Sequence, residues 1–113
     1  LKQYIRISRE LGLSDLAEAH SEEEVSMAAD AGAGIIGINN RNLKTFEVDF
    51  SNALKLRRLV GPDTIFVAES GIRTARDIEA LAEAEVDAVL IGETLMRAPD
   101  RKAALAELKR GCR

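Results

Sequence analysis

Residues 33–39 (Ala-Gly-Ile-Ile-Gly-Ile-Asn) are apolar or glycine at every position except the last. A strand with one face in water alternates apolar and polar residues, whereas a strand of a parallel sheet is covered on both faces and reads as a continuous apolar run. The segment therefore predicts a strand of a parallel sheet. Further short strands are predicted at residues 16–20, 65–69 and 88–92.

Helical segments alternate with these strands. Ser21 and Glu24 have the spacing of a capping box, Thr74 is a second N-cap, and Gly12 and Gly32 are typical helix stops. The expected helices span residues 2–11, 22–31, 51–60, 75–84 and 100–110, with a short turn at 94–97. Such alternation favours an α/β fold with a parallel sheet and right-handed crossovers.

Four strand–helix units amount to half of an eight-stranded barrel. A (β/α)₈ barrel usually needs about 250 residues, and this chain has 113. We therefore expect residues 1–113 to form a single domain that is half of a TIM barrel. The chain begins without Met, at Leu1, inside a predicted helix, which suggests a fragment. A small open four-stranded sheet is the structural alternative.

Composition excludes several classes of partner. The formal net charge of −3 provides no basic face for nucleic acid. Cys112 is the single cysteine, so no disulfide is expected within the chain, and a reducing cytoplasm is the simplest compartment. No apolar run approaches the roughly 18 residues of a membrane span, and we expect no secretory leader before the first helix.

Two acids and an amide fall where predicted strands end. Glu18, Asn39, Glu69 and Gly92 close the four strands in order, and ligands of parallel α/β folds bind at the carboxyl ends of strands. A single acid there is more often a solvated strand end. Several at equivalent positions favour a site in which a carboxylate of raised pKa serves as a general acid or base.

Glycines follow the last two predicted strands. Gly71, and Gly92 with Glu93 before a one-turn helix, offer free backbone N–H groups to a phosphate. The alternative is that these glycines only make tight turns. His20 has no nucleophile or second His at readable spacing, so a structural role is favoured. Met27 and Met96 are interpreted as core residues.

An internal repeat links the two halves of the chain. A shift of 53 residues lays residues 27–39 on residues 80–92, so that Asn39 matches Gly92 and the helix-stop glycine Gly32 matches Glu85. A non-glycine residue held at positive φ costs about 1 kcal/mol. We therefore expect backbone strain at Glu85.

Four segments, residues 16–20, 35–43, 67–72 and 89–97, resemble consecutive signatures of indole-3-glycerol-phosphate synthase. The Ile-Asn-Asn-Arg-Asn-Leu stretch is the strongest match. The resemblance implies strands five to eight of a (β/α)₈ barrel. It also implies a lyase of tryptophan biosynthesis that closes the indole ring of 1-(2-carboxyphenylamino)-1-deoxyribulose 5-phosphate with loss of carbon dioxide and water.

The resemblance also implies roles for single residues, with no cofactor and no metal. Glu18 matches the general base, and Asn39 and Glu69 match polar groups that support the reacting centre. Arg41 and Ser70 match substrate contacts. The backbone phosphate cradle is matched by Gly71, Gly92 and Glu93.

The chain departs from the family pattern in two ways. In the family, segments of the first half of the barrel carry a lysine that acts as a general acid and another essential carboxylate. These segments have no counterpart here, so the chain alone should be nearly inactive. Ala17 and Ala19 replace usual valines, and Glu85 replaces a glycine. Because a half barrel has open strand edges, we expect self-association or pairing with the missing N-terminal half.

Two other functions remain open at this stage. One is a non-catalytic half-barrel fragment that retains at most weak phosphate binding. The other is a different phosphate-binding barrel enzyme such as phosphoribosylanthranilate isomerase, against which residues 39–42 argue.

Overall fold

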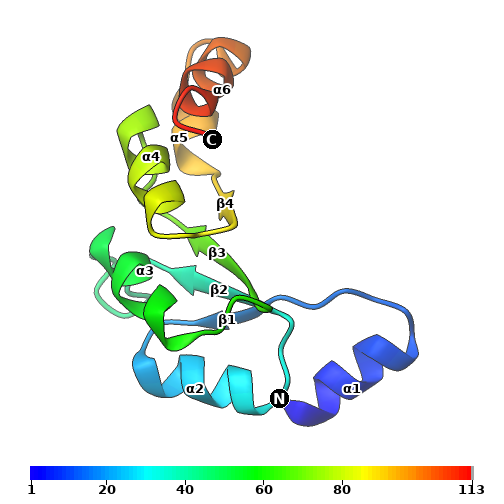
Figure 1. Cartoon of the computed structure of the whole chain (residues 1–113). Helices are drawn as coiled ribbons and strands as arrows, with labels where there is room; N and C mark the ends of the chain where they lie inside the picture. The colour runs from blue at the N-terminus through cyan, green and yellow to red at the C-terminus, as the bar shows by residue number, and fades with distance from the viewer. Residues whose placement is uncertain (113) are drawn as a thin grey trace.

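The computed structural model describes residues 1–112, in which helices and strands alternate along the chain (Figure 1). The strands are β1 (Ala17–Ala19), β2 (Ile35–Asn39), β3 (Ile65–Glu69) and β4 (Ala88–Leu90). The helices are α1 (Lys2–Glu10), α2 (Glu22–Asp30), α3 (Ser51–Leu56) with a 3₁₀ turn η1 (Arg57–Leu59), α4 (Ala75–Glu83), α5 (Glu93–Arg97) and α6 (Arg101–Lys109). The predicted order, one helix followed by four strand–helix units, is confirmed.

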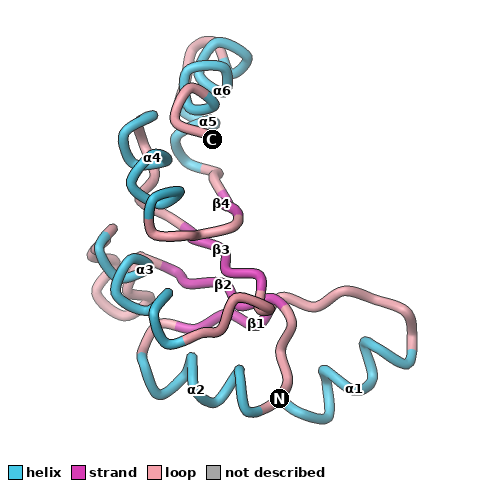
Figure 2. Tube along the Cα trace, in the orientation of Figure 1, coloured by secondary structure: helices cyan, strands magenta, loops and turns pink. Residues whose placement is uncertain are grey.

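The four strands form one parallel sheet in the order β1-β2-β3-β4. Helices α2, α3 and α4 lie along one side of it, and α5 and α6 follow β4 at its far end (Figures 1 and 2). Within the described residues, β1 and β4 each pair with one neighbour only. The arrangement is that of a half barrel, so the predicted fold class is confirmed.

The core lies between the sheet and its helices. The sheet contributes side chains that point toward the helices, among them Ile36, Ile38, Phe66 and Ala68, each without exposed surface. Ala19 lies on the same side and is also fully buried, so the residue that replaces a usual valine does face the helices. Apolar burial of this kind stabilises a fold by about 25 cal/mol per Å².

The opposite face of the sheet is polar toward its carboxyl end and apolar elsewhere. Because side chains alternate along a strand, Glu18, Asn39 and Glu69 share this face with Leu90. No helix covers this side in Figure 1. Leu90, the last residue of the edge strand β4, is 59% exposed, and Ile65, the first residue of β3, is 48% exposed, whereas both faces of a parallel sheet are normally covered.

The helix starts follow the predicted caps with one difference. The Ser21 side chain accepts from the Glu24 backbone N–H at 3.2 Å, as expected. The Glu24 carboxylate, however, accepts from the backbone N–H of His20 at 2.6 Å rather than from that of Ser21. Thr74 and Asp77 form the full reciprocal capping box of α4.

The ends of α2 and α4 match each other as the internal repeat predicts. Gly32 has φ +85° and Glu85 has φ +60°. After α2 the Ala33 N–H donates to the Ala28 carbonyl, and after α4 the Val86 N–H donates to the Leu81 carbonyl, both at 3.0 Å. Both helices therefore end in a left-handed turn, and the prediction that Glu85 occupies a glycine conformation is confirmed.

Three expectations need correction. The strand predicted at residues 88–92 ends at Leu90, so Gly92 is the N-cap of α5. The helix predicted at 51–60 changes to a 3₁₀ turn at Arg57. Met27 and Met96 are 61% and 69% exposed, so their interpretation as core residues is wrong, because neither points toward the sheet.

Among residues 1–112 no helix combines the length and apolar character needed to cross a membrane.

Candidate active site

Two acids and an amide meet on the uncovered face of the sheet. Asn39 and Glu69 are the last residues of β2 and β3 and are partners in the register, while Glu18 lies two residues lower, level with Gly37. The Asn39 Nδ2 donates to the Glu18 Oε1 at 3.3 Å. His20 Nε2 lies 3.5 Å from the same oxygen. The parallel register therefore brings together the carboxylates that the sequence predicted at separate strand ends.

Glu69 is the most buried charged residue of this group. It is 4% exposed, and its Oε1 has no hydrogen-bond partner among the described residues. The pKa of Glu69 is raised above its ordinary value, first because burial disfavours the ionised form and then because the Glu18 carboxylate lies nearby, with a smaller opposing effect of His20. A carboxyl group in this state can hold a proton at a pH where an exposed glutamate has lost it.

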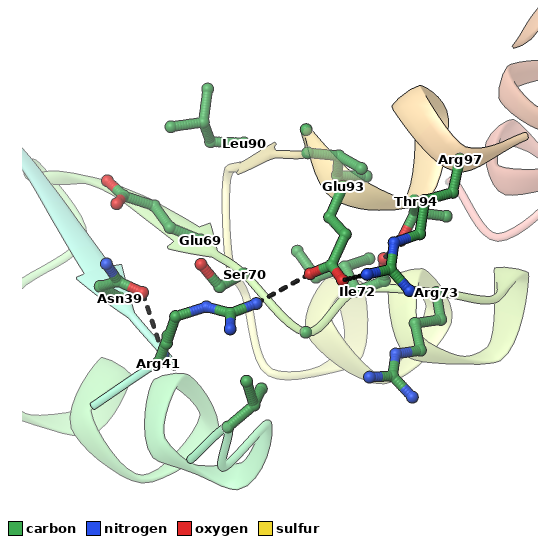
Figure 3. A pocket seen from close by; sticks show the side chains of 14 residues that line it. Asn39, Arg41, Glu69, Ser70, Ile72, Arg73, Leu90, Glu93, Thr94 and Arg97 are labelled. Atoms are coloured by element: carbon green, nitrogen blue, oxygen red, sulfur yellow. Dashed lines mark hydrogen bonds and ion pairs between the residues drawn. The ribbon is translucent and has the colours of Figure 1, made fainter. Parts of the chain in front are cut away.

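A cavity of 680 Å³ opens beside this group, at the carboxyl ends of β2, β3 and β4 (Figure 3). Across it the Arg41 guanidinium pairs with the Glu93 carboxylate at 2.8 Å, and Arg97 pairs with the other Glu93 oxygen at 3.2 Å. The Arg41 backbone N–H donates to the Asn39 Oδ1 at 2.9 Å. The other residues that line the cavity are Val48, Glu69, Ser70, Gly71, Ile72, Arg73, Leu90, Ile91, Gly92 and Thr94.

The turn after β3 has an unusual backbone. Ser70 and Gly71 both have positive φ, +66° and +74°, and a non-glycine residue in this region stores strain that clusters at functional sites. A Cβ at Gly71 would lie 2.5 Å from Cγ1 of Val48, so the Val48 side chain would have to move to admit one. At Gly92 a Cβ would meet nothing within 4 Å, so its backbone is open to the cavity.

Asn40 fixes this turn from inside the protein. Its Nδ2 donates to the Ser70 carbonyl at 3.0 Å, and its Oδ1 accepts from the Ala53 N–H at 3.1 Å near the start of α3. Its backbone N–H donates to the Glu69 carbonyl at 2.8 Å. Asn40 is buried, and all its side-chain bonds serve to join the ends of β2, β3 and α3.

The predicted site residues thus fall into two adjoining groups. The first group, on the face of the sheet, consists of Glu18, Asn39 and Glu69. The second group lines the cavity and consists of Arg41, Ser70, Gly71, Gly92 and Glu93. Figure 3 shows the Glu69 side chain pointing away from the Arg41–Glu93 pair. Glu93 lines the cavity with its side chain as well as its backbone, which the sequence did not predict.

Several residues at the site were missed or underrated from the sequence. His20 was expected to be structural, yet it lies against Glu18. Asn40 belongs to the most strongly matched stretch of the sequence, but no role was predicted for it. Gly37 had a clearer signal, since an isolated glycine inside a strand often marks a close approach of another group. Arg73 and Arg97 also line the cavity; Arg97 ends the family-like segment 89–97 but was given no role, and Arg73 gave no signal.

Four parallel strands alternating with helices, with carboxylates and an open cavity at their carboxyl ends, place this chain in the parallel α/β barrel class. A sequence model of the indole-3-glycerol phosphate synthase family matches residues 1–108, and the chain belongs to that family. The indole-3-glycerol phosphate synthase of Ruminiclostridium cellulolyticum is 61% identical over 109 residues, and that of Endomicrobium trichonymphae is 56% identical over 109 residues. Each match covers 96% of this chain and 42% of the relative.

A solved structure supports the fold. A thiamine phosphate pyrophosphorylase from Pyrococcus furiosus superimposes with a TM-score of 0.77 at 22% identity, over 97% of this chain and 52% of that protein. At this identity the likeness concerns the fold alone. The chain therefore has the architecture of about half of such a protein, and it spans less than half the length of the curated relatives it matches.

Proposed function

We propose that this chain supplies the base and the phosphate-binding part of an active site that closes an indole ring. The substrate would be 1-(2-carboxyphenylamino)-1-deoxyribulose 5-phosphate, which loses carbon dioxide and water in tryptophan biosynthesis. The observation that carries the proposal is the juxtaposition of Glu18, Asn39 and Glu69 with the 680 Å³ cavity that carries Arg41. Membership of the indole-3-glycerol phosphate synthase family selects this reaction among those open to such a site.

In this proposal Glu18 is the general base. It is partly exposed on the open face, and the Asn39 amide holds its Oε1 at 3.3 Å. Glu69 supports the reacting centre as a carboxyl group that retains a proton, which fits its burial and the raised pKa. Proton transfer by positioned groups of this kind typically contributes about 10²–10⁴ in rate.

The cavity would hold the substrate's phosphate and the adjoining chain. The backbones of Gly71, Gly92 and Glu93 form the phosphate cradle, and Arg41 and Ser70 contact the substrate. The Glu93 carboxylate already pairs with Arg41 at 2.8 Å. A bound phosphate would therefore compete with Glu93 for the Arg41 guanidinium, and binding should weaken as salt rises.

A binding titration tests this assignment. Inorganic phosphate or a phosphorylated substrate analogue is titrated into the chain while the backbone amide signals of Gly71 and Gly92 are followed by NMR. Arg41→Ala should weaken binding at least tenfold, and Arg58→Ala, an exposed arginine on η1, should leave it unchanged. Equal affinity in the two variants would remove Arg41 from the site.

The chain alone should be nearly inactive. The relatives extend well beyond the matched region, and the resemblance assigns an essential lysine acid and another carboxylate to the first half of the barrel. Cys112 is the single cysteine, which fits a reducing compartment, and we place the reaction in the cytoplasm on that ground.

The open face and edges support a proposal about partners. Within the described residues β1 and β4 each have one free edge, and Leu90 and Ile65 are about half exposed on the uncovered face. Unpaired edges recruit further strands, so the chain should self-associate or pair with the missing N-terminal half. A monomer in sedimentation at tens of micromolar would contradict this.

The second candidate is a non-catalytic half barrel that associates and retains at most weak phosphate binding. The exposed apolar residues of the uncovered face favour this candidate, because an exposed apolar patch promotes association with another protein surface and requires no catalysis. Weak phosphate binding with no activity after addition of the N-terminal half would support this candidate over the enzyme.

A further inference from the structure

Gly37 is the one position on the uncovered face of β2 without a side chain. It is level with Glu18 on β1 and with Val67 on β3, one row below the Asn39–Glu69 pair. A Cβ at Gly37 would overlap Oε1 of Glu69, and it would lie 3.1 Å from Glu69 Cδ and 2.6 Å from Leu16 Cδ2. The Glu69 side chain therefore leans diagonally across the sheet, into the space that Gly37 leaves.

We propose that Gly37 is a positioning residue of this site: with Leu16 it forms a notch that seats the Glu69 carboxyl group beside Glu18. The proposal rests on the proposed function, in which Glu69 supports the reacting centre. Two independent observations carry it. One is the overlap that a side chain at Gly37 would create, and the other is the buried Glu69 Oε1 without a hydrogen-bond partner.

The notch has little importance for the stability of the fold. The three atoms nearest to a Cβ at Gly37 are the ends of two flexible side chains, and none belongs to the backbone. Both side chains can rotate away, so Gly37→Ala should fold. Alanine in place of a strand glycine also loses less backbone entropy on folding. The change should therefore move Glu69 and leave the core as it is.

The notch decides how Glu69 titrates. The groups that surround it are Glu18 from β1, His20 just after β1 and Asn39 from β2, whereas Arg41 points to Glu93 on the other side. Burial in the notch and the nearby Glu18 carboxylate both raise the pKa of Glu69. A Glu69 side chain expelled from the notch would enter water, and both effects on its pKa would weaken.

The test is a carboxyl titration by ¹³C NMR on the 113-residue chain. In Gly37→Ala the pKa of Glu69 should fall toward its ordinary value, and the urea midpoint should stay equal or rise. Gly34→Ala is the matched control, because Gly34 lies three residues earlier and a Cβ there meets nothing within 4 Å. It should leave the Glu69 titration unchanged. The same Glu69 pKa in wild type, Gly37→Ala and Gly34→Ala would overturn the proposal.

Leu16→Ala provides a second arm that creates no overlap. Removing the Leu16 side chain opens the notch to water, so the Glu69 pKa should again fall, and an unchanged value would overturn the proposal even if Gly37→Ala failed to fold. This titration can fail independently of the proposed function. If the wild-type chain binds no phosphate, the proposed function is contradicted, but the pKa comparison for Glu69 still stands.

Discussion

Replacing Glu85 by glycine should stabilise the chain. Glu85 follows α4 with φ +60°, a conformation that costs a non-glycine residue about 1–2 kcal/mol. Glycine removes this strain but loses about 0.5–1 kcal/mol more backbone entropy on folding. Loss of an exposed negative charge near the C-terminus of α4 adds a few tenths of a kcal/mol. The net gain should be about 1 kcal/mol.

Two backbone contacts of Glu85 survive the change. Its N–H donates to the Ala82 carbonyl at 3.1 Å, and its carbonyl accepts from the Arg57 Nε at 2.7 Å. Urea unfolding at one fixed protein concentration measures the effect, since association changes apparent stability. A gain of 1 kcal/mol corresponds to about 4 °C or more in Tm for a chain of this size.

Glu83→Gly is the matched control for Glu85→Gly. Glu83 is the last residue of α4 and has helical geometry, so the same substitution should lower stability there by about 0.5 kcal/mol or more. A rise in unfolding free energy for Glu85→Gly together with a fall for Glu83→Gly would show that backbone conformation decides the effect of the substitution. A loss of stability in both variants would refute the strain at Glu85.

Three further variants probe the core and the site. Phe66→Ala should lower the unfolding free energy by about 3–5 kcal/mol, because the ring is fully buried; a loss below 1 kcal/mol in urea would contradict its central place. Asn40→Ala should cost about 1–3 kcal/mol by leaving the Ser70 carbonyl and the Ala53 N–H unpaired, whereas Asn42→Ala in the exposed loop should cost less. Glu69→Gln should gain stability relative to wild type as pH rises above 4.5, since the raised pKa makes the unfolded chain release its proton first; a pH-independent difference would contradict this.

Much of the fold was predictable because local signals and long-range pairing agree. The unbroken apolar run of residues 33–39 predicted a parallel strand covered on both faces; the structure has the strand and buries Ile36 and Ile38 completely on the helix side, but no helix covers the other face. The repeat placed Glu85 where Gly32 ends the earlier helix, and both have positive φ. Such agreement across levels is typical of sequences that specify one structure.

The remaining features depend on register, which the sequence does not encode locally. The notch at Gly37 exists only because β2 and β3 pair so that Glu69 leans over an empty position. The contact of His20 with Glu18 and the Arg41–Glu93 pair join residues from different strand–helix units. Met27 was assigned to the core because its helix periodicity could not show which face of α2 meets the sheet.

Reconstitution of activity tests the central claim most directly. The chain is mixed with the part of the Ruminiclostridium cellulolyticum relative that lies outside the 42% matched here, and formation of the indole product is followed. We predict activity in the mixture, none from either part alone, loss of activity in Glu18→Gln, and no loss in Glu22→Gln, an exposed acid in the first turn of α2. A mixture without activity, or full activity in Glu18→Gln, would contradict the account.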